Sequence, residues 1–96
     1  MYARMVTLTF EHGLWAGDGR EWLAERLNGS RRAPGLHASY WMFNRFDGKV
    51  VALAIYETAE ALHASEDRVR HTCAEVADRF ESATQQVEEF EIAGTV

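Results

Sequence analysis

Four stretches of the chain alternate between apolar and polar residues, and two stretches between them repeat with a helical period. The alternating stretches are residues 2–10, 36–44, 49–56 and 87–93. Because successive side chains of a strand point to opposite faces of a sheet, this alternation predicts four strands. One stretch with apolar residues at helical spacing follows the first predicted strand, and another follows the third. The predicted order is therefore strand, helix, two strands, helix, strand.

Residues that cap or end helices mark the two helical stretches. Asp18 can accept bonds from the exposed amides at the start of the first helix, and Asn28-Gly29 ends it. Thr58 predicts the start of a short helix through Leu62, and Ser65 predicts the start of a longer one. The longer helix carries an apolar stripe at three- and four-residue intervals: Val69, Cys73, Val76, Ala77, Phe80 and Thr84.

This order is the ferredoxin-like β-α-β-β-α-β arrangement, an α+β fold with an antiparallel sheet. Asp47-Gly48 between the two middle strands suits a tight hairpin turn, since both residues accept positive φ. The 96 residues form a single domain, 1–96. A domain of this size buries only roughly 60–65% of its unfolded surface, so it would gain stability from dimerisation.

The two middle strands are apolar on both faces of the predicted hairpin. One face is bulky and aliphatic, and we expect it beneath the helices: Leu36, Ala38, Tyr40 and Met42 with Val51, Leu53 and Ile55. The other face mixes rings with small residues: His37, Ser39, Trp41 and Phe43 with Val50, Ala52, Ala54 and Tyr56. Rings opposite small residues are typical of a pocket wall or a partner surface. We therefore expect a homodimer to form through this second face.

Charge and composition argue against several classes of protein. The net charge is −5, whereas binding to nucleic acid needs clustered positive charge. The longest apolar run, 50–56, is far too short to span a bilayer. Met1 leads straight into the first strand without a signal-peptide pattern, and Cys73 is the only cysteine. We expect a cytoplasmic protein that binds neither nucleic acid nor membranes.

Two segments carry a resemblance to a known family. Residues 34–65, PGLHASYWMFNRFDGKVVALAIYETAEALHAS, combine a Pro-Gly strand entry, a hairpin, a strand ending in an aromatic residue and an acidic helix start that leads into Glu-Ala-Leu. The closing VEEFEIA looks like the last strand of the same family. Over nearly its whole length, the chain resembles domains of the antibiotic-biosynthesis-monooxygenase type (ABM-type domains).

The resemblance implies a dimeric α/β barrel with a cavity between the sheet and the helices of each subunit. Members include cofactor-independent oxygenases of polyketide quinones and quinols, haem-degrading oxygenases and proteins with no known reaction, so the fold alone does not fix the function. Our leading hypothesis is a monooxygenase without a bound cofactor that acts on an aromatic or quinone-type molecule. A non-catalytic dimer that binds a hydrophobic ligand, a haem-degrading enzyme, and a cyclase or isomerase stay open.

Candidate site residues lie mainly on the second sheet face. His37 is the candidate proton acceptor, because an imidazole that titrates near neutral pH can take a phenolic proton. Trp41 can stack on an aromatic substrate and donate one hydrogen bond. The expected substrate-binding set is Thr7, Ser39, Phe43 and Tyr56.

Haem-degrading members imply a different set of residues, and this chain departs from it. Those members place an asparagine on the first strand, a tryptophan on the helix after the third strand and a histidine further along. Thr7 and Ala64 stand nearest the first two positions. His71, or else His63, would be the axial ligand if haem bound. The sequence places no second histidine or carboxylate with either histidine, so no metal site is predicted.

Overall fold

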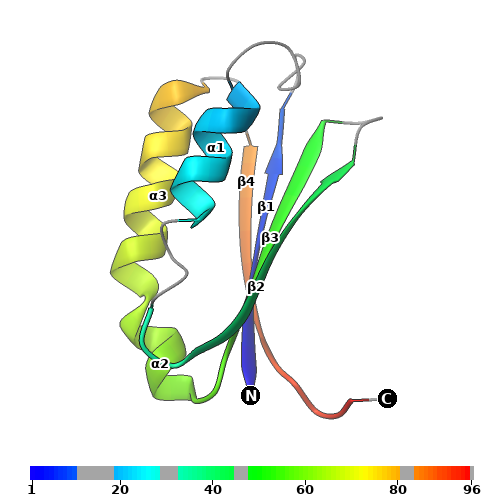
Figure 1. Cartoon of the computed structure of the whole chain (residues 1–96), viewed down its shortest axis with the longest axis vertical. Coiled ribbons are helices and arrows are strands. Elements are labelled where there is room, and N and C mark those ends of the chain that lie inside the picture. The colour runs from blue at the N-terminus through cyan, green and yellow to red at the C-terminus, as the bar shows by residue number, and fades with distance from the viewer. Residues whose placement is uncertain (11–18, 29–32, 45–47, 81–83, 96) are drawn as a thin grey trace.

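The computed structural model describes residues 1–10, 19–28, 33–44, 48–80 and 84–95. Its elements follow the predicted order: β1 (Tyr2–Thr9), α1 (Gly19–Asn28), β2 (Leu36–Asn44), β3 (Lys49–Tyr56), α2 (Ala59–Ala64), α3 (Glu66–Arg79) and β4 (Thr84–Glu91). The strands form one antiparallel sheet in the order β2-β3-β1-β4. Helices α1 and α3 lie on the same face of that sheet (Figure 1). The ferredoxin-like α+β class is confirmed.

The last strand begins earlier than its sequence pattern suggested. Thr84 was expected to continue the apolar stripe of the long helix, but α3 ends at Arg79 and Thr84 is the first residue of β4. Phe80 leaves helical geometry with φ −129° and ψ 88°. Thr84 then pairs with Thr9 of β1, so bonding between strands replaces the helical repeat.

Caps set the short helix α2 and its junction with α3. The Thr58 hydroxyl accepts a hydrogen bond from the Ala61 amide at 3.1 Å, which confirms the predicted cap. Ser65 stands at the predicted start of α3 but makes no side-chain cap bond there. Its hydroxyl donates instead to the Leu62 carbonyl at 2.6 Å. Asp18, the expected cap of α1, lies outside the described residues.

Gly35 lets the start of β2 pass close to α2. Its φ of 75° lies in the left-handed region, and a Cβ placed there would come within 2.5 Å of the Ala61 Cβ. The Glu57 amide donates to the Gly35 carbonyl at 2.9 Å, across the ends of β2 and β3. The Pro-Gly strand entry therefore has a packing role.

The helices cover the face of the sheet that the sequence analysis assigned to a partner. Val50 and Tyr56 are buried beneath the helices, whereas Tyr40 and Met42 are 54% and 49% exposed on the opposite face. The predicted assignment of the two faces was therefore wrong. Alternation separates two faces but does not say which one the helices cover, and bulk was a poor guide because the covered face has small residues at Ala52 and Ala54.

The hydrophobic core lies between the helices and the end of the sheet where β1 finishes and β3 begins. Leu8, Phe10, Leu23, Val50 and Val76 form its buried cluster. Aromatic rings pack edge to face around it, with centroids 5.1 Å apart for Phe10 and Phe80 and 5.7 Å apart for Trp22 and Phe80. Among the described residues, none of the helices has the length and apolarity to cross a membrane.

Candidate functional site

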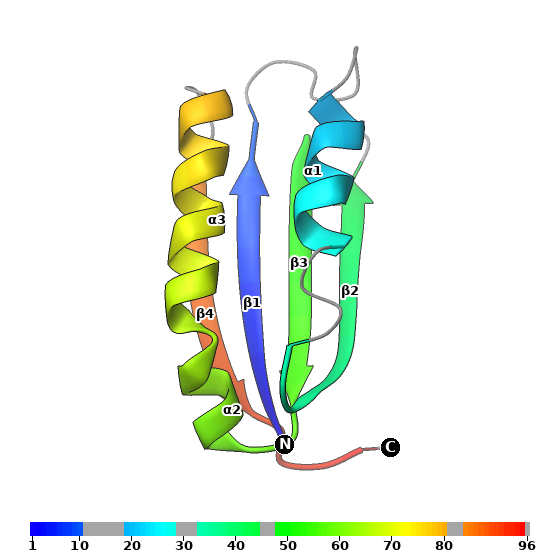
Figure 2. The same cartoon turned by 60° about the vertical axis from the view of Figure 1, so that its left-hand side comes forward.

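A cavity of about 310 Å³ lies between the sheet and helices α1 and α3. Its floor comes from the covered face of the sheet: Arg4, Val6, Leu8, Ser39, Ala52, Ala54 and Tyr56. Its walls come from two helices: α1 (Leu23, Glu25, Arg26) and α3 (Arg68, Val69, Thr72, Cys73, Glu75, Val76). The two helices lie apart from each other over the same face of the sheet (Figure 2). Ala52 and Ala54 of β3 have side chains too short to reach the helices, so space remains between the sheet and the helices.

Arg4 is a buried cation at one end of the cavity floor. Its side chain is 2% exposed, and it ties β1 to the junction of α2 and α3. Nη2 donates to the Leu62 carbonyl at 3.0 Å, and Nη1 donates to the Ser65 hydroxyl. Glu89 of β4 offers a counter-charge at 3.6 Å. The buried charge is thus both hydrogen-bonded and paired, as burial of a charge requires.

Charged side chains of the two helices form the rim of the cavity. Arg26 Nε lies 2.7 Å from Glu75 Oε2, which joins α1 to α3. The guanidinium of Arg26 also lies over the Trp22 ring, 5.0 Å from its centroid. Arg68 lines the cavity too, and no described residue forms an ion pair with it. As far as the described residues go, Arg68 is therefore a cation of the rim that a ligand could pair with.

Hydroxyl and thiol groups supply the remaining chemistry of the cavity. Tyr56 and Thr72 line it, and neither hydroxyl is hydrogen-bonded to a described residue. Burial raises the pKa of the Cys73 thiol, and the positive charge of Arg4 partly opposes that rise. Cys73 is therefore protonated at neutral pH. It is neither a strong nucleophile nor a base.

The cavity brings together only part of the predicted site. Ser39 and Tyr56 line it. Trp41 and Phe43 share the same face but pack against the core, with ring centroids 4.5 Å apart, and do not line the cavity. Thr7 pairs with Val51 and Gln86 on the open face. His37 is exposed at a register shift of β2, between Leu36 and Ala38.

Solved structures share this architecture over the full length of the chain. A protein from Deinococcus radiodurans assigned as an antibiotic biosynthesis monooxygenase is 14% identical, over 100% of this chain and 96% of that chain, with a TM-score of 0.80. SnoaB, a cofactor-independent oxygenase from Streptomyces nogalater, is 16% identical, over 99% and 95%, with a TM-score of 0.73. MhuD, a haem degrader from Mycobacterium tuberculosis with two haems bound in its active site, is 17% identical, over 100% and 99%, with a TM-score of 0.71.

The chain has the ABM-type fold. At these identities the likeness extends to the fold alone, and the neighbours differ in chemistry. No protein-family model and no curated protein sequence matches the chain. The function must therefore be inferred from the residues that line the cavity.

The described residues of the cavity do not fit haem. Haem iron in oxygenases needs an axial ligand from the protein, and no described residue of the lining is a histidine. His71 is 77% exposed, and its Nε2 faces Glu75 Oε1 at 2.9 Å. His63 lies away from the cavity, on α2. The Cys73 thiol is protonated at neutral pH, which disfavours a thiolate ligand.

Sequence reasoning missed the charged residues of the cavity. Arg4 alternates with Val6 and Leu8 along β1, so its side chain lies on the same face of the sheet as theirs. A cation at such an apolar strand position could have indicated a buried charge. Arg68 lies outside the predicted apolar stripe of the long helix, and the packing of α3 on the sheet brings it to the cavity. No metal-binding partner was predicted for His63, but the structure brings Glu66 and Glu89 beside it.

Proposed function

We propose that this protein is a monooxygenase that acts, without a bound cofactor, on a small aromatic molecule of the phenol or quinol type. The observation that carries the proposal is the apolar cavity of about 310 Å³ with Arg68 at its edge, a cation that no described residue pairs. Pockets that take small molecules begin at about 300 Å³. Apolar walls suit fused rings, and an unpaired guanidinium suits a phenolate or enolate oxygen.

The cationic edge of the cavity favours the anionic form of such a substrate. A guanidinium beside a phenol or enol lowers the pKa of that group, because it stabilises the charged form. The proton can leave to water at the rim. The resulting anion is rich in electrons and can pass one to dioxygen. The apolar floor around Val6 and Ala52 limits access of water to the reactive species.

The reaction balances without an external reductant. In an anthrone, the ring methylene of the keto form becomes a carbonyl, so two C–H bonds break and one C=O bond forms. In a quinol, one ring C–H bond becomes C–OH and the two phenolic O–H groups become carbonyls, which gives a hydroxyquinone. One atom of dioxygen enters the product, and the other leaves as water with the two hydrogens. The substrate supplies all four electrons that dioxygen takes up.

Hydroxyl groups of the cavity would orient the substrate in this proposal. Tyr56 and Thr72 can donate to ring oxygens, because no described residue uses their hydroxyls. Ser39, opposite Ala54 on the neighbouring strand, can do the same. Proton transfer to His37 and stacking on Trp41 stay predictions, and the proposal does not require them.

Oxygen uptake tests the proposed activity. The protein is first shown by absorbance to carry neither haem nor flavin, and is then mixed with a panel of quinols and hydroxylated anthrones in an oxygen electrode. We expect saturable uptake with one dioxygen consumed per substrate. Arg68→Met should lower kcat/KM by about a hundredfold, as expected for loss of a group that stabilises developing charge. The matched control is Arg70→Met, because Arg70 is exposed on the same helix and pairs with Asp67.

Three results would contradict this function. Uptake that needs added haem would favour haem degradation. Uptake that Arg68→Met leaves unchanged would remove the cationic edge from the mechanism. Binding of the aromatic panel in the cavity without any uptake would favour the non-catalytic ligand-binding alternative.

We also propose that two copies associate through the open face of the sheet. Large apolar side chains are exposed there, including Tyr40, Met42 and Phe90, and a patch of this kind commonly marks an interface. The predicted dimer thus keeps its sheet-to-sheet form but uses the opposite face. Light scattering should give twice the chain mass for the wild type and the chain mass for a Tyr40→Glu, Met42→Lys double variant. A monomeric wild type would overturn the dimer.

A further inference from the structure

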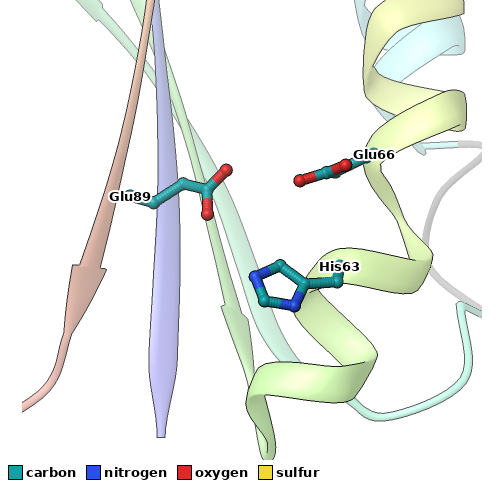
Figure 3. Close-up of side chains that lie close together, drawn as sticks. All are labelled: His63, Glu66 and Glu89. Atoms are coloured by element: carbon teal, nitrogen blue, oxygen red, sulfur yellow. The ribbon is translucent and has the colours of Figure 1, made fainter.

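Three potential metal ligands from separate elements converge outside the cavity. His63 lies in the last turn of α2, Glu66 in the first turn of α3, and Glu89 on β4. Figure 3 shows the imidazole and both carboxylates directed toward a common space. One ligating atom from each residue lies within 4.8 Å of the other two. None of the three residues lines the cavity.

We propose that His63, Glu66 and Glu89 form a binding site for a divalent cation of the zinc or manganese class. Atoms spaced in this way leave a point within about 2.8 Å of all three, and zinc binds imidazole nitrogen and carboxylate oxygen at about 2.0–2.2 Å. All three side chains are exposed, so small rotations can close the remaining distance. One nitrogen and two carboxylate donors suit zinc or manganese better than calcium or copper(I).

The three donors do not use their ligating atoms on one another. Among the described residues, no hydrogen bond or ion pair joins His63, Glu66 and Glu89 to each other. Two carboxylates held this close repel, and a bound cation turns that repulsion into attraction. Exposure leaves the other coordination positions to water, as in zinc sites with three protein ligands.

The buried contacts of Arg4 hold the site in shape. Arg4 bonds to the Leu62 carbonyl and the Ser65 hydroxyl, one residue before His63 and one residue before Glu66. The same guanidinium lies 3.6 Å from Glu89. One buried side chain thus contacts the residue that precedes each of two ligands and pairs with the third ligand, a supporting role that metal sites commonly require. Its positive charge offsets one carboxylate, so we expect moderate rather than very tight binding.

Metal titration of the tag-free protein tests this site independently of the oxygenase. After treatment with a chelator, Zn²⁺ binding is measured by calorimetry and Co²⁺ binding by visible absorbance, which reports direct ligation. We expect one ion per chain. His63→Ala and Glu66→Gln should each weaken binding by about tenfold or more. Circular dichroism confirms that each variant is folded, and exposure of both side chains makes this the expected result.

Matched controls come from the same surface. His71→Ala removes another exposed histidine, which pairs with Glu75. Glu60→Gln removes an exposed glutamate of α2. Both should change the affinity by less than about twofold, in line with surface changes away from a site. The proposal is overturned if no ion binds, if His63→Ala binds as tightly as the wild type, or if His71→Ala or Cys73→Ser abolishes binding.

Discussion

The face of the sheet beneath the helices has a packed half and a hollow half. In the packed half, Val50 faces the rings of Phe10 and Phe43, and the space is filled. In the hollow half, β3 presents Ala52 and Ala54, and a cavity remains. The same strand runs through both halves, so its side chains alternate between the two faces of the sheet in the same way in both. The volume of the side chains that point toward the helices decides which half is packed and which half can bind a ligand.

The largest expected effect comes from opening the packed half. Phe10→Ala removes a buried ring that packs edge to face on Phe80. It should lower the free energy of unfolding by about 3–5 kcal/mol, because a new cavity adds to the lost burial. Urea denaturation followed by tryptophan fluorescence measures the change. A loss below about 1 kcal/mol would show that the packed half is not the main source of stability.

A smaller loss should follow removal of the buried charge at the end of the hollow half. Arg4→Met leaves the Leu62 carbonyl without its guanidinium donor and Glu89 without its counter-charge. The Leu62 carbonyl keeps the Ser65 hydroxyl as a donor, but both hydrogen bonds of the buried guanidinium are lost. We expect the free energy of unfolding to fall by about 2 kcal/mol, as for loss of hydrogen bonds made by a charged group. Arg70→Met is the control, since its pair with Asp67 is exposed and should change stability by less than about 0.5 kcal/mol. Equal effects in the two variants would refute the role of Arg4.

Filling the hollow half should reduce binding and leave stability nearly unchanged. Ala52→Leu places three more carbons over the cavity floor, opposite Val6 and Trp41. Its free energy of unfolding should change by less than about 1 kcal/mol, because free space accepts the larger side chain. Affinity for an aromatic ligand should fall by about tenfold or more, equivalent to about 1.4 kcal/mol. Ala77→Leu, on the exposed face of α3, is the matched control. Unchanged affinity in Ala52→Leu would place the ligand elsewhere.

The smallest expected effect is a pH dependence from the wall of the cavity. Burial raises the pKa of Cys73 in the folded protein above its value in the unfolded chain. The unfolded state then loses its proton first as pH rises. The stability contributed by Cys73 is therefore complete below about pH 8.5 and declines above it. Denaturant unfolding between pH 7 and 10 should show a shallower decline for Cys73→Ser than for the wild type. Identical slopes would contradict the burial of this thiol.

Sequence alone predicted the elements better than the contents of the cavity. Strands β2 and β3 were predicted with the bounds that the structure has, because alternation and the Asp-Gly pair at 47–48 are local signals of the sequence. Asp47 itself lies outside the described residues. Ser39 and Tyr56 were placed on the face that lines the cavity. Arg4 was not recognised, because its partners are Leu62, Ser65 and Glu89, distant in sequence. Contacts between distant segments depend on register and helix packing, which periodicity does not report.

The sequence was also insufficient to predict which face of the sheet the helices cover. Both faces of the middle strands are apolar, so burial could not be assigned from composition. Trp41 was expected at a ligand and instead packs on Phe43 in the core. Thr7 was expected to line the cavity, but its position along β1 places it on the open face of the sheet, opposite Val51. The covered face is the one on which the helices pack, and that packing depends on contacts between segments that are distant in the sequence.

Methyl-resolved NMR during titration with a hydroxylated anthrone shows whether the ligand binds in the cavity, because the two faces of the sheet carry separate methyl groups. We expect saturable shifts at Val6, Val69 and Val76, which line the cavity, and much smaller shifts at Val51 and Ile55 on the open face. Shifts confined to Val51 and Ile55 would refute binding in the cavity, because the ligand would then lie on the face that we assign to a partner subunit.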